Sequence, residues 1–141
     1  MIGAIIAKIA VKKGFKALND HDLEGFMKSW GDNGKWIYPG SLTVSGEFEG
    51  KENVHKWFTR FLDQFPTLTF TINHLGVGNM FDLVGNNVIS AQWDLDLITK
   101  EGMTFKNTGV TVLTIKNGKV VQGLDILENI CGADFRQAWG E

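Results

Sequence analysis

The fold is decided by residues 103–127, MTFKNTGVTVLTIKNGKVVQGLDIL. This stretch is rich in Thr, Val and Ile, which fit the pleated surface of a sheet. It is divided by Asn117-Gly118, a pair that is typical of a two-residue β-hairpin because the turn needs positive φ angles. The sequence therefore predicts two antiparallel strands, Met103 to Lys116 and Lys119 to Leu127.

The residues before this hairpin predict two further strands and, before those, helices. The strands are Leu68 to Val77 and Asn87 to Thr99. A helix from about Lys51 to Phe65 is indicated by apolar residues at helical spacing, closed by Pro66; they are Val54, Trp57, Phe58, Phe61, Leu62 and Phe65. Helices followed by antiparallel strands favour an α+β fold with the helices on one face of the sheet.

Two shorter elements are expected between the first and the clearest helix. Asn19 to Asp22 offers helix caps, and Leu23, Phe26, Met27 and Trp30 then repeat at helical spacing. A short strand from Lys35 to Tyr38 follows.

The first ten residues, MIGAIIAKIA, are apolar on every side of a helix. Basic residues follow this segment instead of preceding it, so a signal peptide is not expected. We expect a helix that is packed on both sides. A helix lying on a membrane surface or in the groove of a partner is the alternative.

Length, charge and cysteine content limit the class of protein. A chain of 141 residues that is 43% hydrophobic predicts one domain, residues 1–141. A net charge of −2 argues against nucleic acid or an acidic membrane as a partner, which leaves small molecules or copies of the chain itself. Cys131 is the only cysteine, so no intrachain disulfide can form; we expect the thiol to be inert packing and the protein to be cytoplasmic.

Three segments resemble the SnoaL-like branch of the nuclear transport factor 2-like superfamily. They are KALNDHDLEGF (16–26), GEFEGKENV (46–54) and IKNGKVV (115–121). The resemblance implies a cystatin-like fold, in which a curved antiparallel sheet packs on three helices and leaves a conical pocket. The segments are structural, so they imply little about the reaction.

Two enzyme groups of that superfamily suggest site residues. At the positions of the ketosteroid isomerase residues this chain has Tyr38, Gly14 and Thr111, so that mechanism is not expected. The Arg-x-Asp and Asp of limonene epoxide hydrolases resemble Gln92-Trp93-Asp94 and Gly123-Leu124-Asp125. The resemblance implies that Asp125 and Asp94 act as base and acid, with Gln92 in place of the bridging arginine. Without that positive charge, one of the two acids should titrate upward.

The direction of Asp94 stays open at this point. Ile89, Ala91, Trp93, Leu95 and Leu97 alternate with Val88, Ser90, Gln92, Asp94, Asp96 and Ile98, and the alternation alone places the second set in water. The resemblance instead places Gln92 and Asp94 in the pocket. It then makes Trp93, Leu95 and Leu97, with Val110 and Val112, the outer face of a homodimer. Asp125 shares its face with Val121, Gly123 and Leu127, which favours an inward position.

Two functions follow as hypotheses. The first is an enzyme that performs general acid/base chemistry, such as epoxide hydration or aldol-type cyclisation, on a small apolar organic molecule. Its catalytic residues would be Asp125, Asp94, Gln92 and Tyr38, and its substrate-binding residues Trp30, Trp36, Phe58, Asn107 and Thr111. The second is a noncatalytic module that binds a hydrophobic ligand or dimerises. No metal-ligand spacing or phosphate loop occurs in the sequence, so no metal and no cofactor are expected.

Overall fold

The computed structural model describes residues 2–130 and 133–141. The helices are α1 (Ile2–Asn19), α2 (Leu23–Met27), α3 (Lys51–Gln64) and α4 (Ala133–Ala138). The strands are β1 (Trp30–Tyr38), β2 (Gly46–Glu49), β3 (Thr67–Val77), β4 (Asn87–Ile98), β5 (Thr104–Lys116) and β6 (Lys119–Leu127). Cys131, whose role we predicted as packing, lies outside the described residues.

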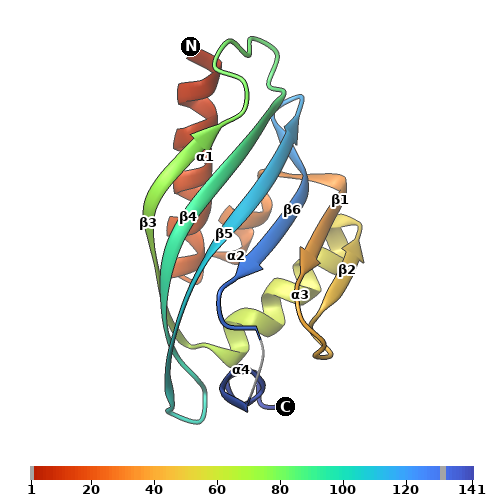
Figure 1. Ribbon diagram of the computed structural model, residues 1–141. Coiled ribbons are helices and arrows are strands. Elements are labelled where there is room, and N and C mark those ends of the chain that lie inside the picture. The colour runs from red at the N-terminus through yellow and green to blue at the C-terminus, as the bar shows by residue number, and fades with distance from the viewer. Residues whose placement is uncertain (1, 131–132) are drawn as a thin grey trace.

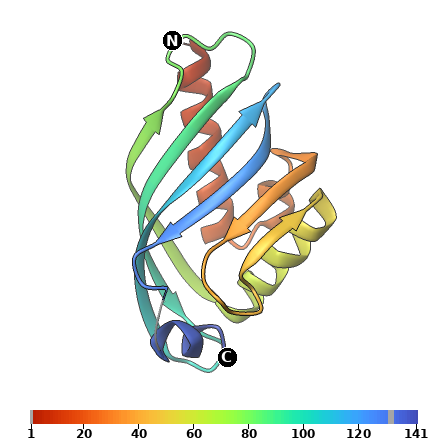
Figure 2. The ribbon, with the colours of Figure 1, turned by 45° about the vertical axis from the view of Figure 1, so that its right-hand side comes forward.

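The strands form one curved sheet in the order β2-β1-β6-β5-β4-β3 (Figure 1). All neighbouring pairs are antiparallel except β1 and β6, which run parallel. Helix α1 packs against β3 and β4, and α3 packs against β1 and β2. Figure 2 shows both helices on the concave side of the sheet. The predicted α+β class with a curved sheet and helices on one face is confirmed.

The hairpin and the long helix form where the sequence predicted them. Asn117 and Gly118 have φ angles of 51° and 74°, as a two-residue turn of this kind requires. Helix α3 buries Val54, Trp57, Phe58 and Phe61, since these residues lie on one side of the helix.

Three details of the chain differ from the prediction. Trp30 does not continue the short helix; it begins β1, where it is 2% exposed and pairs with Val120 of β6. The pairing of β1 with β6 is irregular between Trp30 and Lys35. The segments β2 and α4 were not predicted, because each is short and has little periodicity.

Helix α4 closes one end of the space between sheet and helices. The Trp139 indole Nε1–H donates to Tyr38 Oη at 3.2 Å, and the Gln64 amide donates to the Ala138 carbonyl at 2.7 Å. The Glu141 carboxylate accepts hydrogen bonds from the Thr43 amide and hydroxyl at 3.0 and 2.8 Å. The chain from 135 to 141 is thereby tied to β1, to the loop after it and to α3 (Figure 1).

The expectation that the first helix is packed on both sides is wrong. Ala4, Ala7, Val11, Phe15 and Leu18 are buried, but the opposite side of its first turns is exposed to solvent. The buried side of the helix packs on β3, β4 and α2, and among the described residues Ile2, Ile5, Ile6 and Ile9 on the other side remain exposed. No helix among the described residues is long and apolar enough to cross a membrane.

Candidate functional site

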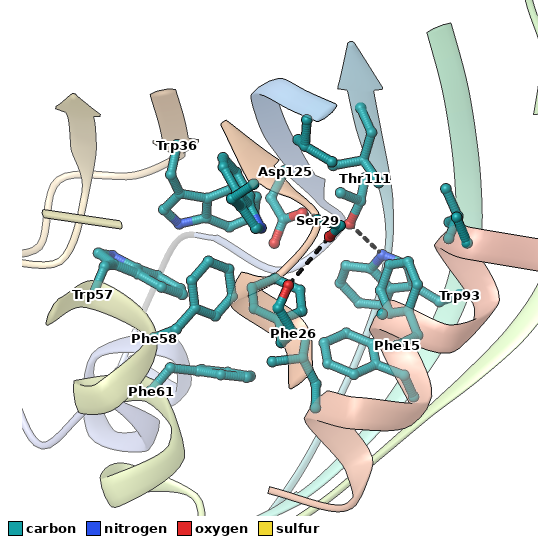
Figure 3. Close-up of a pocket in the computed structure, with 18 of the residues that line it drawn as sticks. Phe15, Phe26, Ser29, Trp36, Trp57, Phe58, Phe61, Trp93, Thr111 and Asp125 are labelled. Atoms are coloured by element: carbon teal, nitrogen blue, oxygen red, sulfur yellow. Dashed lines mark hydrogen bonds between the residues drawn. The ribbon is translucent and has the colours of Figure 1, made fainter. Parts of the chain in front are cut away.

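A cavity lies between the concave face of the sheet and helices α1 to α3 (Figure 3). Its volume is about 80 Å³, enough for several water molecules. Its wall is mainly aromatic and includes Phe15, Phe26, Trp30, Trp36, Trp57, Phe58, Phe61 and Trp93, together with Asp125. Ala10, Gly14, Ser29 and Gly118 also line it, and they are only partly buried or exposed.

Among the described residues that line this cavity, Asp125 on β6 is the one carboxylic acid. It is 7% exposed, and its Oδ1 accepts a hydrogen bond from the Thr111 hydroxyl at 2.6 Å. The Thr111 oxygen in turn accepts the Trp93 indole N–H at 2.9 Å. The three side chains come from the neighbouring strands β4, β5 and β6, and Figure 3 shows the Trp93 indole directed at Thr111. These hydrogen bonds fix Oδ1 of Asp125, while Oδ2 is not one of their acceptors.

Burial raises the pKa of Asp125 from 3.8 to about 7, because the ionised form loses its hydration; the Thr111 hydrogen bond acts in the opposite direction. We expected the repulsion of a second aspartate to cause such a rise, and that cause is wrong. A carboxyl group with a pKa near 7 exchanges a proton at neutral pH, which is what a general acid or base requires.

Tyr38 lies close to this acid, with its ring against those of Trp57 and Trp139 at centroid distances of 4.7 and 5.6 Å. Its pKa is raised well above 10, first by burial and then by the charge of Asp125, while the hydrogen bond from Trp139 lowers it. Tyr38 therefore remains a neutral hydroxyl at every physiological pH. It can donate a hydrogen bond but does not serve as a base.

Two glycines on the sheet make room for the indoles in the wall. A Cβ on Gly123 of β6 would lie 2.8 Å from the Trp36 ring and 3.1 Å from the Trp30 ring. A Cβ on Gly109 of β5 would lie 2.8 Å from the Trp93 ring. Real Cβ atoms do not approach other atoms so closely, so these strands take tryptophans on their concave face only because their neighbours lack side chains.

Trp36 contributes a donor without a partner. Among the described residues, its Nε1 is the buried side-chain nitrogen or oxygen that makes no hydrogen bond. Its ring lies between Trp57 and Phe58, with centroid distances of 5.2 and 5.0 Å. A buried donor without an acceptor costs free energy, which an oxygen atom of a bound ligand would offset.

The structure brings most of the predicted site residues together. Those that line the cavity are Asp125, Tyr38, Trp30, Trp36, Phe58 and Thr111. Their functional roles stay predictions.

Gln92 and Asp94 are not part of this site, so the expectation that they face the pocket is wrong. Both are exposed on the convex face of β4, and Asp94 accepts a hydrogen bond from Asn73 at 3.0 Å. Trp93, Leu95 and Leu97 face inward instead, at 1%, 6% and 7% exposure. Burial of these three large side chains outweighs any gain from two polar ones, so the apolar set takes the core face.

The same inversion corrects the predicted dimer face. Trp93, Leu95 and Leu97 lie in the core and cannot meet a second copy. Val110 and Val112 do lie on the convex face, since Thr111 between them points inward.

Asn107 lies outside the aromatic cavity as well. It lines a second cavity of about 490 Å³ under α4, together with Lys106, Asp134, Phe135 and Trp139. Asn107 donates to the Asn129 carbonyl at 3.1 Å and accepts from the Asn129 amide at 3.2 Å, so its amide is used to hold the chain after β6. Tyr38 and Phe61 form part of the wall of both cavities.

Sequence reasoning missed several wall residues. Trp93 was left between two interpretations, of which the plain alternation of the strand predicts its inward position and the resemblance to limonene epoxide hydrolases the outer one. Phe26 was predicted to lie on the apolar side of a helix but not to contact a ligand, and Phe15 was not singled out, because no local signal distinguishes a core residue from a ligand contact. Within the described ranges, no group of three or more His, Cys, Asp or Glu side chains could hold a metal ion.

Comparisons with known proteins identify the family of this chain. The model of the SnoaL-like domain matches residues 11–123. No curated protein matches the chain.

Solved structures share the fold at low identity. Bal32a, from a soil-derived mobile gene cassette, has a TM-score of 0.79 at 19% identity, with 91% of this chain and 93% of that chain covered. RV0760c from Mycobacterium tuberculosis, in complex with estradiol-17beta-hemisuccinate, has a TM-score of 0.73 at 20% identity, with 94% and 96% covered. TerC co-crystallised with polyporic acid has a TM-score of 0.72 at 15% identity, again with 94% and 96% covered. Since the family model covers most of the chain, this protein belongs to the SnoaL-like domain family and has the nuclear transport factor 2-like fold.

Proposed function

We propose that the chain binds a small, largely apolar ring compound in the aromatic cavity and that Asp125 transfers a proton to and from it. The observation that carries the proposal is the position of one buried carboxyl group, with a pKa of about 7, in an otherwise aromatic wall. A strongly perturbed acid in a cavity is typical of a functional site.

The ligand class follows from the chemistry of the wall. Aromatic rings on three sides favour a flat or ring-shaped apolar molecule. The unpartnered Trp36 N–H and the neutral Tyr38 hydroxyl favour an oxygen on that molecule, such as a carbonyl. The fold relatives seen with estradiol-17beta-hemisuccinate and with polyporic acid support a ligand of this kind.

The reaction class follows from the presence of Asp125 in the cavity without a second aspartate beside it. In its ionised form Asp125 takes a proton from the carbon next to a carbonyl, which leaves an enolate. The same carboxyl then returns the proton to another atom, as an isomerisation or an aldol-type cyclisation requires. Epoxide hydration by a pair of aspartates is not proposed, since Asp94 lies on the opposite face of the sheet.

The test uses 2-tetralone in deuterated water, with deuterium uptake beside the carbonyl followed by NMR. The rate should rise with pH and level off above about 7, because the base is the ionised form of Asp125. Asp125→Asn should abolish the enzyme-dependent uptake. The matched control is Asp94→Asn, which changes an exposed acid and should leave the rate unchanged. Uptake that survives Asp125→Asn would contradict the assignment of the base.

A noncatalytic binding role is the second candidate, and one observation favours it. Trp93, Thr111 and Asp125 already satisfy one another by hydrogen bonds, as a purely structural network would. Quenching of tryptophan fluorescence by estradiol-17beta-hemisuccinate measures binding without chemistry. Quenching by this probe, together with no deuterium uptake into 2-tetralone, would favour the binding role.

A further inference from the structure

Exposed apolar side chains gather at one end of the molecule. Of the eleven large hydrophobic side chains exposed in the described residues, eight come from α1 and from the loop between β3 and β4. We call these eight the apolar tip: Ile2, Ile5, Ile6, Ile9, Met80, Phe81, Leu83 and Val84. Leu83 and Phe81 are 86% and 77% exposed, values that are rare for side chains of this size unless something covers them.

The two segments of the apolar tip form one surface. A Cβ on Gly3 would lie 2.0 Å from the backbone oxygen of Asp82, so the start of α1 is in contact with the loop. The loop also meets the β5–β6 hairpin, where the Gly118 amide donates to the Gly85 carbonyl at 3.0 Å. Figures 1 and 2 show α1, this loop and the hairpin at the same end of the molecule.

The loop holds one carboxylate, that of Asp82, inward and its large apolar side chains outward. The Asp82 carboxylate is 3% exposed and accepts hydrogen bonds from the Val84 and Asn86 amides at 3.0 Å. Asn87, which is 5% exposed, bonds to the backbone of Asn79. This arrangement is the reverse of an ordinary water-facing loop, and it holds the apolar side chains in place.

Lysines follow the apolar tip along α1 and lie on the β5–β6 hairpin beside it. Helix α1 contains Lys8, Lys12, Lys13 and Lys16 and no acidic residue. Lys12 and Lys13 lie three and four residues after Ile9, so they continue the same face of the helix. The hairpin adds Lys116 and Lys119. The chain as a whole carries a net charge of −2, so this end is positive against a negative remainder.

We propose that the apolar tip docks on an anionic membrane surface. The apolar side chains enter the boundary between headgroups and acyl chains, and the lysines contact the lipid phosphates, as in interfacial helices that combine the two features. The small net charge of −2 led us to expect no membrane partner. The lysines, however, are concentrated at one end of the molecule, and this distribution favours binding to an anionic membrane. A second copy fits less well, because a two-fold contact through this patch would bring lysines against lysines.

The test is flotation with phosphatidylcholine vesicles, with and without phosphatidylglycerol. The protein should float with the anionic vesicles and much less with the neutral ones. The double variant Phe81→Asp, Leu83→Asp should lose flotation, because it places charge at the two most exposed apolar positions. The double variant Lys12→Gln, Lys13→Gln should weaken binding to anionic vesicles about 30-fold, since each lysine near such a surface contributes about 1 kcal/mol.

Two matched controls locate the effect. Ile98→Asp adds the same charge at an exposed apolar residue at the other end of β4, and Lys56→Gln removes an exposed lysine of α3. Both should bind as the parent does, and thermal unfolding should show that all variants are folded. The proposal is overturned if the parent fails to float with anionic vesicles, or if Ile98→Asp abolishes flotation as well. It is also overturned if the apolar tip proves to join two copies, seen as a dimer that Phe81→Asp dissociates.

Discussion

Asp125 lowers the stability of the folded protein whenever it is ionised. Its pKa is about 7 when folded and near 3.8 when unfolded, so between these values the folded state binds a proton that the unfolded state does not. This contribution to stability is full below about pH 4 and is lost as the pH rises to about 7. At 1.36 kcal/mol per pKa unit, the loss is on the order of 4 kcal/mol.

Asp125→Asn should remove this dependence, because the amide has the same shape and no charge. Urea unfolding should show the variant to be more stable than the parent at pH 8 and the two to converge toward pH 4. Asp94→Asn serves as the control and should keep the dependence of the parent, since Asp94 is exposed. A difference between parent and Asp125→Asn that stays constant from pH 4 to 8 would show that Asp125 titrates as a solvated acid.

The sequence allowed a better prediction for Asp125 than for Asp94. The neighbours of Asp125 on its own face, Gly123 and Leu127, are both buried, so their character indicated the inward position. Apolar and polar residues alternate regularly along the strand that contains Asp94. Its two faces therefore differ mainly in how much apolar area each would bury if it faced the core. The apolar area of Trp93, Leu95 and Leu97 was a better guide to the inward face than the resemblance of three residues to an enzyme motif.

At the scale of elements, the paired glycine and indole positions set the shape of the cavity. Trp36 on β1 lies opposite Gly123 on β6 in the register of the parallel pair. Such cross-strand partners are not visible in a sequence, because β1 and β6 are separated by more than eighty residues and their parallel pairing was not predicted. The hairpin and α3, in contrast, depend on local signals and were predicted correctly.

Gly123→Ala should therefore damage the cavity wall. The added methyl group would lie 2.8 Å from Trp36, and the strain should cost about 1–3 kcal/mol in urea unfolding. The emission of tryptophan should shift as well, because Trp30 and Trp36 move. Gly31→Ala is the control, since its nearest neighbour would be 3.5 Å away. Equal effects of the two substitutions would show that Trp36 can move aside freely.

At the scale of the whole molecule, no helix of the described residues covers the convex face of the sheet. Val110 and Val112 of β5 lie beside Ile126 and Leu124 of β6 on that face. These four side chains form an apolar area at its centre, and we propose that it joins two copies into a homodimer.

Sedimentation at micromolar concentration should show a dimer, and Val112→Asp should convert it to a monomer with unchanged secondary structure. The charge would be buried between the two copies without a partner, which is strongly unfavourable. Phe81→Asp lies at the apolar tip and should leave the dimer intact. A parent protein that sediments as a monomer would contradict the proposed dimer face.

The closure by α4 has a consequence for how the protein is made. The contacts that complete the wall join Tyr38 to Trp139 and Thr43 to Glu141, positions 101 and 98 residues apart in the chain. Chains emerge from the ribosome in order, and contacts so distant form late. The second cavity, which α4 lines, is therefore completed only after the sheet has formed, and Tyr38 stays accessible from that side until α4 has docked.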